Sequence, residues 1–263
     1  MIISDIDAFI ASGNFPPKRI ISLVPSLTEL LVDIGLEDAL VGVTKFCVHP
    51  VGINKRVQVI GGTKNLRVDL IRSLNPDLII ANKEENEQNQ VEALASDVPV
   101  YLSEITCVAD AYEMMRIVGR LTQTTTTVQQ RIFELERAEA GLRQQSSISP
   151  PKKVLYLIWR DPWMSAGGDT FIDDMLNCCG WENVVAERRR YPSISDTEIR
   201  ALEPELVLLS SEPYPFKDKH RAEIEALLPN AKVQLADGEA FSWYGTRMHH
   251  SFDYLRNLVA KMA

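Results

Sequence analysis

The sequence lacks the features of membrane-spanning, nucleic-acid-binding and disordered proteins. No apolar run in its 263 residues approaches the roughly 20 residues that cross a bilayer. A formal net charge of −8 argues against a nucleic-acid-binding protein, because such proteins present a basic face to the phosphates. With 45% hydrophobic and 24% charged residues, the composition is that of an ordinary globular protein.

Cysteine is scarce and has no metal-binding spacing. The four cysteines, Cys47, Cys107, Cys178 and Cys179, form no CxxC pair, which excludes a zinc ribbon or a thioredoxin motif. A disulfide between the adjacent Cys178 and Cys179 would be strained, so the sequence predicts buried free thiols. The amino-terminal stretch has no basic region followed by an apolar region, so we expect either no export or a signal that has already been removed.

Catalytic and nucleotide-binding motifs are also missing. The chain has no GxSxG, HExxH or Walker sequence and no GxGxxG after a strand, and we therefore predict that it is not an enzyme. Gly167 and Gly168 stand before a helix expected from Asp169, but they lack the lysine and the spacing of a phosphate-binding loop. We predict no nucleotide site there.

A repeat is the most informative feature that the sequence does contain. VDLIRSLNPDLII, which begins at Val68, returns as DTEIRALEPELVLL, which begins at Asp196, and Pro76 matches Pro204. Each copy predicts a short amphipathic helix that stops before the proline and is followed at once by an apolar strand. A second pair of segments, which open with RIISLVPS and KVLYLIWR, shares the order strand, turn, helix. Two similarly wound α/β lobes follow from these two correspondences.

Strands and helices alternate in both halves, which predicts parallel sheets flanked by helices. The expected strands are 19–24, 40–44, 78–81, 98–102, 153–159, 206–210 and 232–236, and the expected helices of the second half are 169–178, 196–202, 218–227 and 247–262. Between the halves, apolar residues recur at helical spacing, and the threonine run 124–127 predicts a break before about 20 residues of helix. We therefore expect an α/β lobe over 1–121, a backbone helix and linker over 122–150, and a second α/β lobe over 151–263.

One ordered set of segments resembles a known family. RIISLVPSLTELL, VGVTKFCVHP, GGTKN, LNPDLIIA and RYPSIS follow one another as in the binding proteins of ATP-driven (ABC) importers for cobalamin, haem and ferric siderophores. The resemblance covers nearly the whole chain from Arg19 onward. It implies two Rossmann-like lobes with parallel sheets, joined by one long backbone helix, with a ligand cleft between the lobes.

The resemblance also implies a function and a location. A monomeric protein of this kind would capture a metal complex, a corrinoid first and haem or a ferric siderophore next, and deliver it to an ABC permease dimer. It would have no intrinsic cofactor and would lie in the periplasm or cell envelope, with the cytoplasm left open. Cobalamin-binding members carry a cysteine near the position of Cys179 that pairs with one in the last helix. The last helix here, RMHHSFDYLRNLVAKMA, has no cysteine, which is a departure that bears on oxidising export.

Candidate ligand-binding residues follow the expected strands. PSLTE fits a capping box, with Ser26 as N-cap and Glu29 three residues on, and this helix start lies beyond the carboxyl end of the first strand, where α/β sheets bind ligands. Capping is the main prediction for Ser26 and a ligand contact the second. Aromatic residues in loops would either form flat walls for a macrocycle or fill the core, and core filling is favoured for Trp159. These aromatic residues are Phe46, Trp159, Trp163, Tyr191, Trp243 and Tyr244.

The family's ligand-contacting loops, carried onto this sequence, nominate a second set of residues. That set is His49, Thr63, Asn82, Trp163, Tyr191, Trp243 and Arg247. His49 either donates an axial nitrogen to cobalt or haem iron or stays at the surface. The histidines predict no metal site in the protein alone, because no carboxylate is obviously paired with them. His220, within the charged segment KDKHRAE, is expected to be solvated.

Acidic residues in the first turns of the repeated helices are candidate docking residues. The resemblance implies that Asp69 in the first copy, and an acidic residue in the second, meet arginines on the permease. The residue aligned with Asp69 is Thr197, with Asp196 and Glu198 on either side, and Glu198 is the candidate. The helix dipole alone would also favour acidic residues at these positions. The enzymatic alternative is an intracellular, chelatase-like tetrapyrrole-handling protein, since such enzymes also hold a macrocycle between two α/β lobes. Turnover of a tetrapyrrole with a divalent metal would support the enzyme, and tight binding without turnover would support the receptor.

Overall fold

The computed structural model describes residues 1–12 and 15–262, and its contacts divide the chain into two units. The first unit comprises Met1–Ile105, Ala109–Glu134 and Tyr244–Arg247, and the remainder of the chain forms the second unit. Relative to the boundaries expected from the sequence, the long helix is shared by the two units. The segment Tyr244–Arg247, late in the chain, is counted with the first unit.

The first unit is built on a four-stranded parallel sheet in the order β2–β1–β3–β4. Its strands are short, nearly continuous apolar runs that are almost wholly buried, as is usual for a parallel sheet covered by helices. The strands are β1 (Ile20–Ser22), β2 (Leu40–Val43), β3 (Leu78–Asn82) and β4 (Val100–Ser103). The helices along this part of the chain are α1 (Ile6–Ala11), α2 (Pro25–Asp33), η1 (Glu37–Ala39), α3 (Ile53–Arg56), α4 (Val68–Ser73), α5 (Gln88–Ala95) and α6 (Val108–Leu121).

The second unit holds a six-stranded sheet with the main path β10–β9–β5–β6–β8, and β7 also pairs with β5. The strands are β5 (Lys152–Trp159), β6 (Trp163–Ser165), β7 (Trp181–Asn183), β8 (Ser193–Ile194), β9 (Leu206–Ser210) and β10 (Lys232–Ala236). The helices of this unit are α8 (Phe171–Cys178), α9 (Asp196–Leu202), α10 (Asp218–Leu227), α11 (Glu239–Ser242) and α12 (Met248–Met262).

The wholly parallel sheet expected for the second lobe is wrong at two strands. β6 pairs antiparallel with β5, and β8 pairs antiparallel with β6, whereas β7, β9 and β10 continue the parallel arrangement around β5. The connection between β5 and β6, Arg160–Pro162, is far too short for the crossover that parallel strands require. Asp161 adopts a φ of +66°, and the chain therefore reverses in a tight turn.

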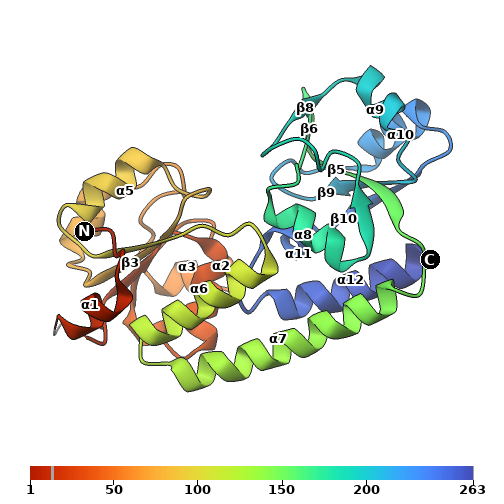
Figure 1. The fold of residues 1–263 in the computed structure, drawn as a ribbon. Helices are drawn as coiled ribbons and strands as arrows, with labels where there is room; N and C mark the ends of the chain where they lie inside the picture. The colour runs from red at the N-terminus through yellow and green to blue at the C-terminus, as the bar shows by residue number, and fades with distance from the viewer. Residues whose placement is uncertain (13–14, 263) are drawn as a thin grey trace. The chain divides into compact units, whose positions relative to one another are not determined.

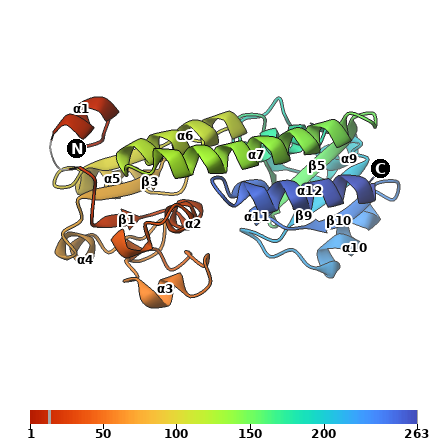
Figure 2. The same cartoon turned by 90° about the horizontal axis from the view of Figure 1, so that it is seen from below.

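The long helix expected in the middle of the chain is confirmed as α7 (Thr125–Ser146), which is about 33 Å long. The expected break before it is also confirmed, since Gln123 has a φ of +56° between α6 and α7. The two helices lie side by side in both views (Figures 1 and 2). No helix that the structure describes, α7 included, combines the length and the apolar character needed to cross a membrane.

The repeated sequence is confirmed as a repeated structural unit. In the first unit α4 is followed by β3, and in the second α9 is followed by β9, each an interior strand of its sheet. Ile71 of α4 and Ile199 of α9 are both fully buried in the apolar core of their own unit. The sequence repeats because each sheet needs the same amphipathic helix beside an interior strand.

Candidate ligand-binding site

A buried asparagine ties together the loops at one edge of the first sheet. Asn86 Nδ2 donates to the carbonyl oxygens of Leu23 at 3.2 Å and Thr63 at 3.1 Å, and Asn86 Oδ1 accepts from Asn82 N at 3.0 Å. This edge contains the carboxyl ends of parallel strands, beyond which α/β sheets bind ligands. We did not predict Asn86 from the sequence, although a polar residue in the ANKEEN loop after an apolar strand was a usable signal.

Asn82 and Thr63 lie at this edge but are themselves nearly buried. Asn82 Nδ2 donates to the backbone and side-chain oxygens of Ser103, at 3.3 and 3.2 Å. Asn82 Oδ1 accepts from the backbone amides of Glu84 and Glu85, at 2.8 and 3.2 Å. The amide of Asn82 therefore shapes the turn after β3, and a ligand contact by Asn82 or Thr63 stays a prediction.

In the loop after β2, the exposed Phe46 is followed by the buried Cys47. Cys47 Sγ lies 3.0 Å from Thr28 Oγ1 and 3.3 Å from Thr44 Oγ1, and burial raises the pKa of this thiol. Phe46, the residue before it, is 49% exposed, and Lys45 Nζ lies 4.9 Å from the centre of its ring. Because the buried Cys47 side chain anchors the loop to Thr28 and Thr44, Phe46 stays at the surface of the unit, where a ligand can reach it.

The capping box expected at Ser26 is wrong. α2 begins at Pro25, so Ser26 lies inside the helix, and Glu29 Oε2 instead accepts from Arg247 Nε at 2.8 Å. Proline at the first helical position has no amide that needs a partner, which allows α2 to start without a side-chain cap. The Glu29 and Arg247 side chains are 11% and 14% exposed. Burial raises the pKa of Glu29, against the lowering influence of Arg247 and of the nearby His49.

The segment Tyr244–Arg247 packs on α2. Gly245 has a φ of +89°, and a Cβ atom at this position would lie only 3.5 Å from Leu30 Cβ and 3.7 Å from the carbonyl oxygen of Ser26. Tyr244 beside it is buried. The structure thus brings Tyr244 and Arg247, both predicted site residues, to the same helix as Ser26.

The two tryptophans around the β5–β6 turn differ in burial, and a ligand contact by Trp163 stays a prediction. Core filling, favoured for Trp159, is wrong, because Trp159 is 39% exposed and makes an edge-on contact with Tyr214 at 5.5 Å between ring centres. Trp163 is the buried one, with Nε1 donating to Asp196 Oδ1 at 2.9 Å and the ring stacked on Phe216 at 6.1 Å. Trp159 is the last residue of β5 and lies past the buried stretch of that strand.

Tyr191 and Trp243 are half-buried aromatic residues of the second unit. The guanidinium of Arg190 lies 5.9 Å from the centre of the Tyr191 ring. Trp243 follows α11, just beyond the carboxyl end of β10, and its Nε1 donates to Glu212 Oε1 at 3.0 Å. Both residues keep part of their surface accessible, as a ligand contact requires.

The glycine pair before α8 serves the protein's own backbone. The amides of Gly167 and Gly168 donate to the carbonyl oxygens of Arg190 at 2.7 Å and Arg188 at 3.0 Å. A Cβ atom on Gly167 would lie 2.1 Å from the Arg188 carbonyl oxygen, so only glycine fits this close approach. These amides bind the backbone of the connection between β7 and β8 and are therefore already occupied.

The expectation that His220 is solvated is wrong. Its side chain is buried, its Nδ1 accepts from Lys217 N at 2.9 Å, and its Nε2 lies 3.1 Å from Tyr214 Oη. The charged neighbours on α10 misled the prediction, because His220 turns back to cap the start of its own helix. Burial, chiefly, lowers the pKa of His220. Among the residues that the structure describes, no group of three or more His, Cys, Asp or Glu side chains could hold a metal ion.

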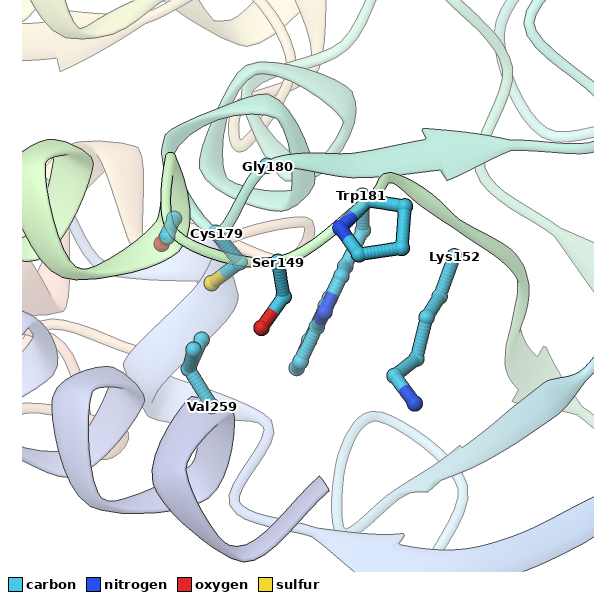
Figure 3. Close-up of a pocket in the computed structure, with 8 residues that line it drawn as sticks. Ser149, Lys152, Cys179, Gly180, Trp181 and Val259 are labelled. Carbon is cyan, nitrogen blue, oxygen red and sulfur yellow. The ribbon is translucent and has the colours of Figure 1, made fainter. Parts of the chain in front are cut away.

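A small pocket lies in the second unit, at the amino ends of β5 and β7 (Figure 3). Its lining residues are Ser146, Ser149, Pro150, Lys152, Cys179, Gly180, Trp181 and Val259. Lys152 and Trp181 begin β5 and β7, so the pocket lies at the end of these strands opposite to their carboxyl ends. The expected burial of the thiols is confirmed for Cys47, Cys178 and Cys179, while Cys107 is half-buried. Burial raises the pKa of Cys178 to about 12.

The two candidate docking acids differ in their surroundings. Asp69 is fully exposed, 3.9 Å from Arg72 on the same helix. Glu198 instead closes a capping box, with its Oε2 accepting from Ser195 N at 2.8 Å, and its Oε1 accepts from Arg188 Nη2 at 2.7 Å. These bonds, led by the one from the Ser195 amide, lower the pKa of Glu198 to about 2. The segment SDTE has the same S-x-x-E spacing as the start of α2, and it is here that the capping box forms.

Curated relatives and solved structures resemble most of this chain. It is 26% identical over 195 residues to the vitamin B12-binding protein of Yersinia pestis strain Pestoides F, a match that covers 73% of this chain and 69% of the relative. The periplasmic vitamin B12 binding protein of Vibrio cholerae has a similar fold, with a TM-score of 0.81, 19% identity, and 94% and 98% of the two chains covered. A periplasmic haem-binding protein from Pseudomonas aeruginosa has a TM-score of 0.79, 22% identity, and 94% of each chain covered.

A family match joins these likenesses to the sequence. The family described as periplasmic binding protein matches residues 20–234, which is most of the chain. The match supports the two-lobed α/β fold with its long helix and the predicted role in import, and it does not support the chelatase alternative. The protein therefore belongs to the periplasmic binding protein family.

Proposed function

We propose that the protein is the substrate-binding component of an ABC-type importer and that it captures a metal-containing macrocycle or metal chelate, a corrinoid first and haem or a ferric siderophore next. Family membership and the vitamin B12-binding relatives support this proposal. The observation that carries it is the set of accessible aromatic rings, Phe46, Tyr191 and Trp243, in loops at the strand ends of α/β sheets. Flat rings with polar neighbours suit a large planar ligand better than a bare ion.

The remaining nominated residues have supporting roles in this proposal. Their side chains are buried or occupied by the protein, and they would shape the loops that carry the accessible rings. These residues are Ser26, Thr63, Asn82, Trp163, Tyr244 and Arg247. Tyr191→Ala and Trp243→Ala should each weaken the binding of a macrocyclic ligand by about 1–3 kcal/mol, the free energy of a lost aromatic contact.

Absorbance titration with cyanocobalamin, haemin and a ferric siderophore tests the ligand class. We expect a saturable spectral change with cyanocobalamin at the lowest concentration. A change with haemin or the siderophore alone would reassign the ligand within the proposed function. Binding of none of the three probes would contradict the proposal.

His49 is the proposed axial ligand of the bound metal. It lies in the half-buried part of the loop after β2, near enough to Glu29 to influence its pKa. His49→Ala should alter the metal-centred absorbance bands of the complex. Unchanged bands with unchanged affinity would place His49 outside the coordination sphere.

Binding without turnover and delivery to a permease complete the proposal. The cellular location would be the periplasm or cell envelope, as for the periplasmic relatives. Incubation with a tetrapyrrole and a divalent metal should give no metallated product. Formation of that product would revive the enzymatic interpretation.

A further inference from the structure

A carboxylate that no sequence pattern singled out holds the indole of Trp243. Glu212 follows β9, and its Oε1 accepts two hydrogen bonds, from Trp243 Nε1 at 3.0 Å and from Ser242 Oγ at 2.8 Å. β9 and β10 are neighbouring parallel strands, so the loops that follow them meet at the carboxyl edge of the second sheet. Glu212 therefore lies at the edge where the proposed ligand contacts lie.

The backbone of Glu212 is itself held in place. Ser210 Oγ donates to the Glu212 carbonyl oxygen at 2.5 Å, and the hydroxyl of the fully buried Tyr156 lies 3.1 Å from the same Ser210 Oγ. On the other side, Gly238 packs so closely that a Cβ atom there would lie 2.5 Å from Glu212 Cγ. The carboxylate is thus presented by a rigid support, which is what precise orientation of a binding group needs.

The electrostatic surroundings make this carboxylate sensitive to pH. Burial is the main cause that raises the pKa of Glu212, and Glu239 and Asp237, from the loop and helix that follow β10, add to it. The bonds from Ser242 and Trp243 act in the opposite direction, because they favour the ionised acceptor. On the β5 side, Tyr156 is the titratable neighbour, and its pKa is raised far above the range of these carboxyl groups.

We propose that Glu212 is a positioning residue that fixes the orientation of the Trp243 ring and thereby sets ligand affinity. The inference rests on the proposed function only for the ligand contact by Trp243. Without the acceptor on Glu212, the indole N–H of this half-buried ring would lose the hydrogen bond that Glu212 provides, and the ring would be less constrained in its orientation. A pre-oriented ring binds a flat ligand more tightly than a mobile one, because less side-chain entropy is lost on binding.

Two substitutions at Glu212 separate positioning from a general structural role. Glu212→Gln keeps an acceptor for Trp243 Nε1, whereas Glu212→Ala removes it. We expect the indole N–H resonance of Trp243, assigned with Trp243→Phe, to move to the position of a solvent-exposed indole in Glu212→Ala and to stay nearly unchanged in Glu212→Gln. Affinity for cyanocobalamin and haemin should fall about tenfold in the alanine variant and by less than about threefold in the glutamine variant.

A pH series provides the second readout. In the wild type, the Trp243 indole resonance should titrate with a midpoint above the ordinary glutamate value, and this titration should disappear in Glu212→Gln. Asp237→Asn is the matched control, because it removes a nearby negative charge and keeps the oxygen that accepts from Glu239 N at 3.1 Å. The control should retain the titration, shifted to lower pH.

The outcomes distinguish the inference from the function on which it rests. An indole resonance that does not move in Glu212→Ala would overturn the inference, whatever the protein binds. A resonance that moves without a change in affinity would equally overturn it, since the orientation of Trp243 would then not matter to the ligand. Failure of the wild type to bind any probe would count against the proposed function itself.

Discussion

Arg247 Nε lies 2.8 Å from Glu29 Oε2, although 218 positions separate the two residues in the sequence. Both side chains are nearly buried, and the pair fastens the segment Tyr244–Arg247 to α2 in the first unit. Removal of one partner from a buried ion pair leaves an uncompensated charge, which typically costs 3–5 kcal/mol. Arg247→Met should therefore lower the free energy of unfolding of the ligand-free protein by about 3 kcal/mol, measured by urea denaturation.

A double variant checks that the cost comes from the stranded carboxylate. Glu29→Gln added to Arg247→Met removes the charge that Arg247→Met leaves behind, so part of the lost stability should return. Equal stability of the single and double variants would mean that Arg247 stabilises the unit by packing alone. A wild-type-like Arg247→Met would show that the pair has no structural role.

His220 predicts a loss of stability in mild acid. Its Nδ1 accepts a hydrogen bond from Lys217 N, so the bound form is the neutral imidazole, and burial keeps its pKa below the ordinary value of about 6.5. The unfolded chain therefore takes up a proton before the folded one does. Stability from this group is complete above about pH 6.5 and is lost as the pH falls from there through the lower folded pKa.

Urea denaturation at pH 7.5 and 5.5 measures this effect. The difference in unfolding free energy between the two pH values should be smaller in His220→Gln than in the wild type, because glutamine does not titrate. His250→Gln is the matched control, since His250 is exposed on α12, and it should keep the wild-type difference. The prediction fails if His220→Gln and His250→Gln both retain the wild-type difference in unfolding free energy between the two pH values.

The two tryptophans of the β5–β6 turn should respond oppositely to truncation. Trp163 is buried against Phe216, so Trp163→Ala should cost about 3–5 kcal/mol of stability through the cavity that it leaves. Trp159 is partly exposed, and Trp159→Ala should cost less than about 1 kcal/mol. Thermal denaturation of the ligand-free variants decides between them, and similar losses would contradict the burial that separates the two rings.

Local patterns predicted the elements of this fold well. Apolar runs and helical periodicity placed the seven expected strands and the long helix close to where β1–β5, β9, β10 and α7 lie. The strands β6, β7 and β8 were not predicted, because each has only two or three residues and is too short to show a pattern. Their places follow from tertiary pairing, of β6 and β7 with β5 and of β8 with β6.

Tertiary contacts explain what the sequence could not predict about the site. The partner of Glu29 is Arg247, more than 200 residues away in the sequence. Local sequence around PSLTE does not reveal this pairing and therefore predicts a capping box. Asn86 and Glu212 look like ordinary loop residues in the sequence, and only the fold shows that they hold Thr63 and Trp243. The aromatic candidates could be chosen from the sequence by residue type. Only the structure shows that Phe46 is accessible and Trp163 is buried.

Charge reversal at Glu198 would not be a clean test of docking. Glu198→Arg would break the capping box with Ser195 and the bond from Arg188, so a loss of transport could come from a disturbed α9. With a pKa of about 2, this carboxylate stays ionised near neutral pH. Its contribution to the stability of the folded protein is lost only as the pH falls below the ordinary glutamate range toward 2. Glu198→Gln removes the charge and keeps one acceptor oxygen, which suffices for the bond from the Ser195 amide, whereas its amide nitrogen cannot accept the bond from Arg188.

Docking on a permease therefore predicts a specific result for Asp69→Asn combined with Glu198→Gln. Asp69 is fully exposed, so its replacement removes a charge that the fold does not need. The double variant should bind cyanocobalamin within about threefold of the wild type, a change of about 0.65 kcal/mol. It should nevertheless lose most of its stimulation of permease ATPase activity in vesicles, because charges at the rim of an interface chiefly speed association with the partner. The stimulation that remains should depend less on salt than that of the wild type. Full, salt-sensitive stimulation by the double variant would show that these two acids serve only their own helices.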